Sequence, residues 1–252
     1  MVFELSDFES YDASVPRALD TARLQPLLAD QTTILLKPNL VNTSRFPVTT
    51  SPDFCRTVIT YIQACSNATI ILGEGCGDSS HDTDAVFRHL GFEDLAREFD
   101  IELLDLNHAP LIKKKLDGNR IFPEIYLPEI AFDSFIISLP VLKAHSLAVV
   151  TGTLKNMMGF APPKYYSGSG VWKKAMFHEQ MQTSIKELCR YRTPDLTIMD
   201  ASVGLAEYHL GGPCCSPPVK KILVSDDPYK ADQCAAKLLG LVPETIPHIQ
   251  KD

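Results

Sequence analysis

The sequence predicts an α/β fold with a mainly parallel sheet, helices on both faces and an added antiparallel hairpin. Short apolar runs recur along the 252 residues, and helical patterns separate several of them. Most of these runs end abruptly in polar residues. A hydrophobic content of 45% and a charged content of 22% are typical of a globular chain. We therefore expect one α/β domain over residues 1–252, or two closely packed lobes.

The first elements form a strand–helix–strand unit. The apolar run Thr32–Leu36 is followed by Ser51 and Pro52, which suit the N-cap and the first position of a helix. Apolar residues at helical spacing continue to Cys65, and the next apolar run is Thr69–Leu72. Two such strands joined by a helix predict a parallel pair with a right-handed crossover.

The middle of the chain predicts two helices, a strand and a hairpin. The helices are expected from Asp82 to Leu90 and over Phe92–Phe99, and the strand over Ile101–Leu104. The runs 111–116 and 120–126 flank an Asp-Gly turn signal, which predicts an antiparallel hairpin over residues 111–126.

The last third predicts a loop and further alternation of helices and strands. Residues 159–174 are rich in Gly, Pro, Ser and aromatics, which is typical of a long loop or a lid. An apolar helical stripe runs from Phe177 to Leu188, with His178 beside it. Strands are expected at Leu196–Met199 and Lys221–Val224, and a helix capped by Asp227 follows the second of them.

Composition and cysteine usage exclude several classes of protein. The net charge of −7 argues against a general nucleic-acid binder, and no apolar run is long enough to predict a membrane span. The acidic start lacks the basic and apolar regions of a secretory signal, so a cytoplasmic location is expected. Seven cysteines, including the adjacent Cys214 and Cys215, show no spacing for a disulfide framework, a metal or a cluster. The cofactor stays unknown.

Polar residues crowd the segment Leu139–Gly159, directly after an apolar strand. The carboxyl ends of parallel strands lie on one edge of a sheet, so five such strand ends are expected to converge on one cleft. Cations, amides and an imidazole there predict a site for a small anion. The backbone N–H groups where Thr151–Gly159 enters a short helix are also expected to favour that anion. The candidate catalytic residues are His145, which is expected to act as a neutral base, Lys143 and Glu74. The candidate ligand-binding residues are Lys37, Asn39, Thr153, Lys155, Asn156, His178 and Asp200.

Structural interpretations of the same residues stay open. A solvated loop, a capped helix carrying an exposed lysine, or a histidine with one structural hydrogen bond would give the same pattern. Glu74 lies between two glycines and could be an acid, a metal ligand or a residue of a tight turn. The phosphate-binding patterns of NTP-binding and dinucleotide-binding proteins are absent from the sequence.

These residues resemble the family named domain of unknown function 362. The matching elements are Lys37-Pro38-Asn39-Leu40-Val41, Leu139-Pro140-x-Leu142-Lys143-x-His145, Thr151-Gly152-x-x-Lys155-Asn156-x-x-Gly159, His178, and Pro194-Asp195-Leu196 before Asp200-Ala201. The resemblance implies an association with iron–sulfur proteins, because members often carry a ferredoxin-like segment. This chain lacks those cysteine repeats, so a cluster would belong to a separate partner. The early strand–loop–helix pattern is also faintly similar to nickel-pincer lactate racemases, which act on hydroxy acids.

Two functions are therefore weighed. The first is an enzyme, an isomerase, racemase or oxidoreductase, that acts on a small carboxylate or phosphate by acid–base chemistry. The second is a non-catalytic ligand-binding or electron-transfer accessory protein that works with an iron–sulfur partner.

Overall fold

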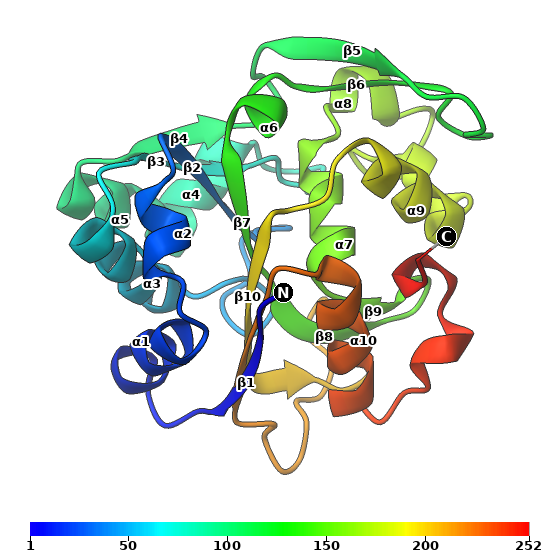
Figure 1. Cartoon of the computed structure of the whole chain (residues 1–252). Coiled ribbons are helices and arrows are strands. Elements are labelled where there is room, and N and C mark those ends of the chain that lie inside the picture. The colour runs from blue at the N-terminus through cyan, green and yellow to red at the C-terminus, as the bar shows by residue number, and fades with distance from the viewer. Residues whose placement is uncertain (252) are drawn as a thin grey trace.

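The computed structural model describes residues 1–251 and contains a nine-stranded mixed sheet (Figure 1). Its main path is β1-β11-β10-β7-β2-β3-β4, and β8 pairs with β10 and β9. The run from β10 to β4 is parallel, which confirms the predicted fold class. The strands are β1 Phe3–Asp7, β2 Thr33–Pro38, β3 Thr69–Glu74, β4 Glu102–Asp105, β7 Phe135–Leu139, β8 Val141–His145, β9 Val149–Thr151, β10 Leu196–Leu205 and β11 Lys221–Ser225.

Helices cover both faces of this sheet (Figure 1). On one face lie α1 Tyr11–Thr21, α2 Gln25–Ala29, α3 Pro52–Cys65, α4 Thr83–Leu90 and α5 Phe92–Phe99. On the other lie α6 Ile130–Asp133, α7 Thr153–Asn156, α8 Pro163–Tyr166, α9 Met181–Tyr191 and α10 Pro228–Leu238, with the 3-10 turns η1 Met157–Phe160, η2 Ala175–His178, η3 Pro243–Thr245 and η4 Pro247–Ile249. None of the helices in residues 1–251 has the length and apolar character needed to cross a bilayer.

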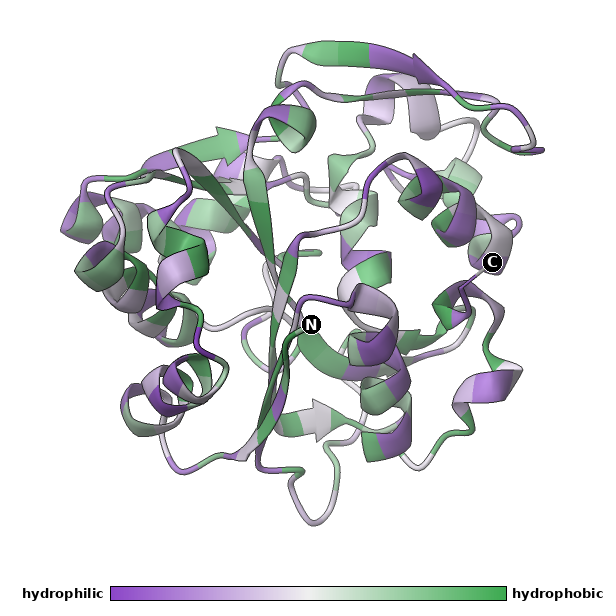
Figure 2. Ribbon diagram, in the orientation of Figure 1, coloured by the Kyte–Doolittle hydropathy of each residue, from purple (hydrophilic) through white to green (hydrophobic). Residues whose placement is uncertain are grey.

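The strands supply both hydrophobic cores because successive side chains of a strand point to opposite faces. In β2, Ile34 and Leu36 belong to the core under α1 to α5, whereas Leu35 belongs to the core under α6 to α10. Figure 2 shows the resulting pattern, in which the central strands are largely hydrophobic and hydrophilic residues gather on the outer sides of the helices.

The predicted helix caps are present. The Ser51 side chain accepts a hydrogen bond from the backbone of Asp53 at the start of α3, and the Asp82 carboxylate accepts one from Ala85 at the start of α4. Asp227 accepts from the backbone of Tyr229 and Lys230 at the start of α10. These caps satisfy backbone N–H groups in the first turn and so fix where each helix begins.

The predicted hairpin forms a separate two-stranded sheet of β5 Leu111–Lys115 and β6 Glu124–Pro128. Gly118 in its turn has φ +85°, a left-handed conformation that glycine adopts without strain. The hairpin lies above the main sheet in Figure 1, beside α8.

The segment after β7 continues the sheet instead of leaving it. Pro140 separates β7 from β8, and the long β10 pairs with both, through Leu196↔Ile137 and Asp200↔Val141. The chain then turns back through β9 into α7 and η1. The polar stretch Leu139–Gly159 is therefore ordered by strand pairing.

One of the five strand ends lies elsewhere. We expected the residues after Lys221–Val224 to join the common cleft, but β11 runs antiparallel to β10, with Thr197↔Ser225 and Ala201↔Lys221 as partners. Its carboxyl end therefore lies at the opposite edge of the sheet, and the expectation for Ser225 to Pro228 was wrong.

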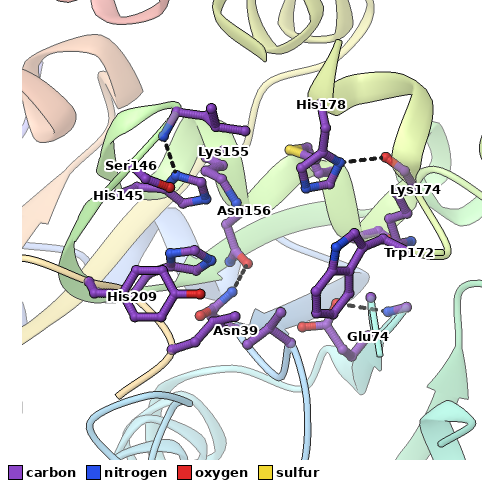
Figure 3. Close-up of a pocket in the computed structure, with 18 residues that line it drawn as sticks. Asn39, Glu74, His145, Ser146, Lys155, Asn156, Trp172, Lys174, His178 and His209 are labelled. Carbon is purple, nitrogen blue, oxygen red and sulfur yellow. Dashed lines mark hydrogen bonds between the residues drawn. The ribbon is translucent and has the colours of Figure 1, made fainter. Parts of the chain in front are cut away.

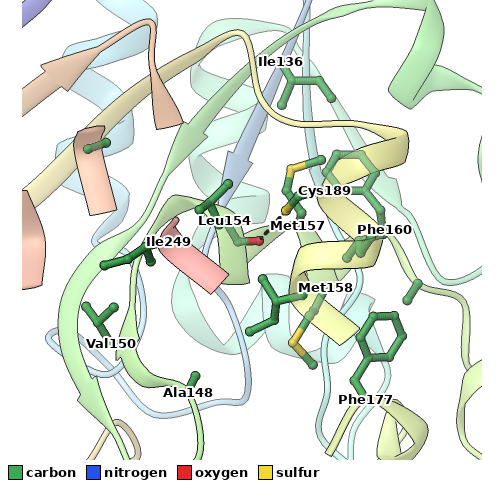
Figure 4. Close-up of a cluster of buried hydrophobic side chains, with 14 of the residues drawn as sticks. Ile136, Ala148, Val150, Leu154, Met157, Met158, Phe160, Phe177, Cys189 and Ile249 are labelled. Atoms are coloured by element: carbon green, nitrogen blue, oxygen red, sulfur yellow. Dashed lines mark hydrogen bonds between the residues drawn. The ribbon is translucent and has the colours of Figure 1, made fainter. Parts of the chain in front are cut away.

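A dense apolar cluster holds α7 and η1 against α9 (Figure 4). Leu154, Met157, Phe160 and Phe177 are at most 1% exposed, and the Cys189 thiol reaches the carbonyl oxygen of Leu154 at 3.6 Å. Because buried side chains in such a cluster are closely packed, α7 and η1 have little freedom to move. Their polar faces are thereby fixed toward the carboxyl edge of the sheet.

Candidate functional site

A pocket of about 230 Å³ lies where the carboxyl ends of β2, β3 and β8 meet α7 (Figure 3). The segment after β10 and the stretch before η2 complete its walls. It is lined by Asn39, Val41, Glu74, Gly75, Gly77, His145, Ser146, Leu147, Lys155, Asn156, Met158, Gly159, Trp172, Lys174, His178, Tyr208, His209 and Leu210.

The structure brings most of the predicted site residues together. Those that line the pocket are Asn39, Glu74, His145, Lys155, Asn156 and His178. Lys37 and Lys143 lie directly beneath it, each hydrogen bonded to a lining residue. Thr153 and Asp200 do not line it.

Lys37 and Glu74 form the floor of the pocket. Lys37 Nζ lies 2.6 Å from Glu74 Oε1, and it also donates to the Pro38 carbonyl at 2.8 Å. The second carboxylate oxygen accepts from the backbone N–H of Leu40 at 2.7 Å, which ties the two strand ends together. Burial lowers the pKa of Lys37, while the Glu74 charge acts in the opposite direction.

Lys143 adds a second buried cation. Its Nζ donates to Asn39 Oδ1 and to the Val48 carbonyl at 2.7 Å, and within residues 1–251 it has no carboxylate partner. Burial lowers the pKa of Lys143 to about 7, and the nearby Lys155 charge acts in the same direction. Both effects disfavour the charged form of Lys143, and a nearby negative charge would favour it.

Thr153 and Asp200 have structural partners. The Thr153 hydroxyl contacts Thr197 Oγ1 at 2.9 Å, beneath α7. The buried Asp200 carboxylate accepts from the Tyr11 hydroxyl at 2.6 Å and from the Ser202 backbone at 2.9 Å. These contacts join β10 to α1 and shape the strand, away from the pocket.

The start of α7 was expected to favour an external anion, but the protein supplies its own. Asp232 on α10 accepts from the backbone N–H groups of Thr153 at 2.7 Å and Leu154 at 3.0 Å. A Cβ at Gly152 would overlap this carboxylate, so the glycine is what lets α10 approach. That expectation was therefore wrong for the backbone N–H groups.

The rest of the Thr151–Gly159 motif shapes the pocket floor. Asn156 Nδ2 donates to the Lys37 carbonyl at 2.9 Å, and its Oδ1 accepts from Lys37 Nζ at 3.2 Å. A Cβ at Gly159 would overlap the Lys37 and Glu74 side chains. The motif thus positions Asn156 and brings η1 onto the buried ion pair.

Lys155 is the cation that faces the pocket without a partner. It makes no hydrogen bond or ion pair with any of residues 1–251, although its side chain is largely buried. Burial lowers the pKa of Lys155 to about 8. An unpaired, partly desolvated ammonium is costly by itself and favours a bound anion.

Three further residues line the pocket that sequence patterns did not identify as site residues: Lys174, Trp172 and His209. Lys174 is 4% exposed, donates to the carbonyls of Ala161 at 2.7 Å and Gly159 at 3.1 Å, and has its pKa lowered to about 7 by burial. Trp172 and Lys174 lie in the stretch expected to be a loop or lid, which was the only signal for them. His209 follows a strand end without any recognisable pattern.

The hydrogen bonds of His145 define its tautomer. Its Nδ1 accepts from the backbone N–H groups of Leu147 at 3.0 Å and Ala148 at 3.2 Å. A ring nitrogen that accepts carries no proton, so the neutral ring carries its proton on Nε2. Burial, reinforced by the Lys155 charge, lowers the pKa of His145 to about 2. His145 is therefore a neutral hydrogen-bond donor, whereas the sequence suggested a base.

His178 has the complementary tautomer. Its Nδ1 lies 3.1 Å from the Lys174 carbonyl oxygen, which can only accept, so Nδ1 carries the proton and Nε2 keeps its lone pair. Burial lowers the pKa of His178 as well. Figure 3 shows His178 and His145 on opposite sides of the pocket, a neutral acceptor facing across from a neutral donor.

His209 stacks on His145, with ring centroids 3.7 Å apart and an interplanar angle of 15°. Burial and, to a smaller extent, the Lys155 charge lower the pKa of His209 to about 3. Within residues 1–251 no cluster of three His, Cys, Asp or Glu side chains is arranged to hold a metal ion. The site is thus a cation-rich pocket with neutral imidazoles on its walls.

Fold and site together define an α/β protein with a lysine-rich and histidine-rich pocket at the carboxyl edge of its sheet. The chain belongs to the family described as domain of unknown function (DUF362), whose model matches residues 34–237. No curated protein matches the sequence.

The fold is similar to that of the lactate racemase apoprotein from Thermoanaerobacterium thermosaccharolyticum, with a TM-score of 0.57 and 15% sequence identity. The similarity covers 93% of this chain and 56% of that one, so the chain spans little more than half of that protein. At this identity the likeness establishes the fold.

Proposed function

We propose that this protein is an enzyme that binds a small carboxylate or phosphate in the pocket and moves a proton on it. The observation that carries the proposal is the grouping of an unpaired Lys155 with the complementary tautomers of His178 and His145. The lysine supplies binding energy for the anion, and the two imidazoles supply a proton acceptor and a proton donor.

The geometry supports proton abstraction next to a carbonyl or carboxylate carbon. His178 Nε2 takes the proton, and the electron pair of the broken C–H bond moves onto the neighbouring oxygen. Lys155 and the Nε2–H of His145 stabilise the negative charge that develops there. Return of the proton from His178 regenerates the enzyme, and return to a different face or atom gives an isomer. No redox co-reactant is needed.

Isomerisation is the reaction class to test first. The similar structure is named as a racemase, and a racemase catalyses such a reaction. The buried Lys174 lines the pocket and Lys143 lies beneath it, and both favour the additional negative charge of the intermediate over the smaller charge of the bound substrate. This difference in stabilisation is what lowers a barrier.

Binding is tested by calorimetric titration of phosphate and of 2-oxo and 2-hydroxy carboxylates. Lys155→Met is expected to weaken anion binding about tenfold or more, because it removes a charged contact. The matched control is Lys237→Met, since Lys237 is exposed on α10 and lies outside the pocket. Equal binding by the two variants would remove Lys155 from the proposal.

Catalysis is tested by ¹H NMR in D₂O, which detects exchange of the carbon-bound protons of the same 2-oxo acids. His178→Asn is expected to slow enzyme-dependent exchange about 100-fold or more, the usual contribution of a general base. His89→Asn, on the exposed face of α4, is the control. Tight binding without any exchange would overturn the catalytic assignment and favour the alternative of a non-catalytic ligand-binding protein.

A further inference from the structure

The pocket combines a polar floor with apolar walls. Lys155 and Asn156 supply polar groups next to the floor formed by Lys37 and Glu74, whereas Met158, Leu147, Tyr208 and Trp172 contribute carbon surface to the lining. A phosphate or a two-carbon carboxylate would use the floor alone. The apolar side chains in the lining therefore indicate that the rest of the ligand is apolar.

Trp172 is a large aromatic residue that remains exposed at the pocket. Its side chain lines the pocket and is nevertheless 46% exposed, and Tyr208 on the same pocket is also 46% exposed. Large aromatic side chains left open at a concave polar site are typical of ligand contacts, since covering them removes apolar area from water.

The wall that faces Trp172 is built from flat rings. His209 stacks on His145, and the Tyr208 ring meets His209 edge-on, with centroids 5.0 Å apart and an angle of 67°. Figure 3 shows Trp172 on one side of the pocket and His209 on the other. Aromatic rings on two sides of a pocket suit a flat ligand group, because aromatic rings prefer offset-stacked or edge-to-face contacts.

We infer that the ligand carries a flat aromatic ring as well as its anionic group, with the ring between Trp172 and His209 and the anion at Lys155. The inference rests on the proposed function and narrows its substrate class to aromatic carboxylates or phosphates. Trp172 is then a specificity-determining residue, and His209 has a binding role in addition to its packing on His145.

Matched pairs of probes test the ring separately from the anion. Propionate is compared with 3-phenylpropionate and 3-cyclohexylpropionate, and inorganic phosphate with phenyl phosphate, by calorimetric titration of the full chain. Trp172 is the single tryptophan of the sequence, so quenching of its emission reports ligand contact in the same samples. The phenyl-bearing probes are expected to bind about tenfold more tightly than their parent anions, and more tightly than the cyclohexyl probe.

Three variants assign the effect to Trp172. Trp172→Ala is expected to abolish the advantage of the phenyl group, and Trp172→Phe to keep most of it. Val171→Ala is the control, because Val171 is adjacent, 81% exposed and outside the pocket lining. Both positions are exposed enough for the fold to tolerate the changes.

The outcomes separate this inference from the proposed function. Equal binding of propionate and 3-phenylpropionate, or of the phenyl and cyclohexyl probes, would overturn the flat-ring inference and leave the anion site standing. Absence of binding by every anion would overturn the proposed function as well.

Discussion

Lys37 and Glu74 come from neighbouring parallel strands and form an ion pair of 2.6 Å at the base of the pocket, where their side chains are 0% and 3% exposed. The carboxylate also accepts from the backbone N–H groups of Leu40 and Gly75. Each charge is therefore held by its partner and by the strand ends. The candidate catalytic Glu74 and the candidate ligand-binding Lys37 thus neutralise one another, and the proposed function assigns contact with the anion to Lys155.

Replacing the carboxylate is expected to destabilise the protein strongly. Glu74→Gln leaves Lys37 buried without a counter-charge, and the expected loss is about 3 kcal/mol in the free energy of unfolding. Urea denaturation measures it. Glu98→Gln is the control, because Glu98 pairs with Arg56 on the surface, where an ion pair contributes at most about 1 kcal/mol. A similar loss in both variants would contradict this account of the pocket floor.

A methyl group at Gly159 is expected to disturb the same pair. Its Cβ would overlap Lys37 and Glu74, so η1 or the ion pair must shift, and we expect Gly159→Ala to cost about 1–3 kcal/mol of stability and to weaken anion binding. Gly77→Ala is the matched control, since a Cβ at Gly77 meets its nearest atom at an ordinary 3.8 Å. Thermal unfolding and calorimetric titration measure the two effects. If Gly159→Ala behaves like Gly77→Ala, η1 does not rest on the ion pair.

Acid is expected to unfold the protein through its buried imidazoles. The pKa values of His145, His209 and His248 are lowered from 6.5 to about 2, 3 and 4. Below pH 6.5 the unfolded chain therefore binds more protons than the folded chain. These imidazoles therefore make their full contribution to the free energy of unfolding above about pH 6.5. This contribution is lost as the pH falls from 6.5 toward 3. His209→Phe is expected to flatten this slope in urea titrations at several pH values, whereas His89→Phe on the surface is not. Parallel slopes for both variants would refute the role of His209.

The tautomers of the two pocket histidines are expected to appear directly in ¹⁵N NMR spectra. His145 should show its proton on Nε2 and no titration between pH 5 and 9, because two backbone N–H groups occupy Nδ1. His178 should show its proton on Nδ1 at neutral pH. His145→Ala and His178→Ala assign the signals. A protonated Nδ1 on His145 at neutral pH would remove it as the neutral donor.

Lys155 is expected to be unusually reactive toward an amine-specific reagent. Its pKa is lowered to about 8 by burial, so a larger fraction of its side chain is the neutral, nucleophilic amine at pH 7.5 than for a surface lysine. Mass spectrometry after brief reaction with an acylating reagent compares Lys155 with the exposed Lys237. Phosphate in the pocket should slow the modification of Lys155 alone. Equal rates at both sites would contradict the lowered pKa.

Local signals in the sequence identified most of the secondary structure. The strands around Ile34 and Ile71, the caps at Ser51 and Asp82 and the hairpin turn at Gly118 are set by residues a few positions apart, so periodicity and turn chemistry suffice to predict them. The sequence also placed polar residues at strand ends, and the parallel strand order then brought them to one edge.

Which of these residues line the pocket depends on contacts between segments that are far apart in the sequence. Asn156 reaches Lys37 across 119 positions of the chain, and Asp232 reaches the backbone of Thr153 across 79. Such pairings determine burial, and burial determines charge state, so Glu74 became the partner of Lys37 while Lys155 stayed unpaired. Strand direction, which reversed β11, and the placement of Trp172 and His209 also depend on packing between distant segments, for which a local pattern of residues carries no signal.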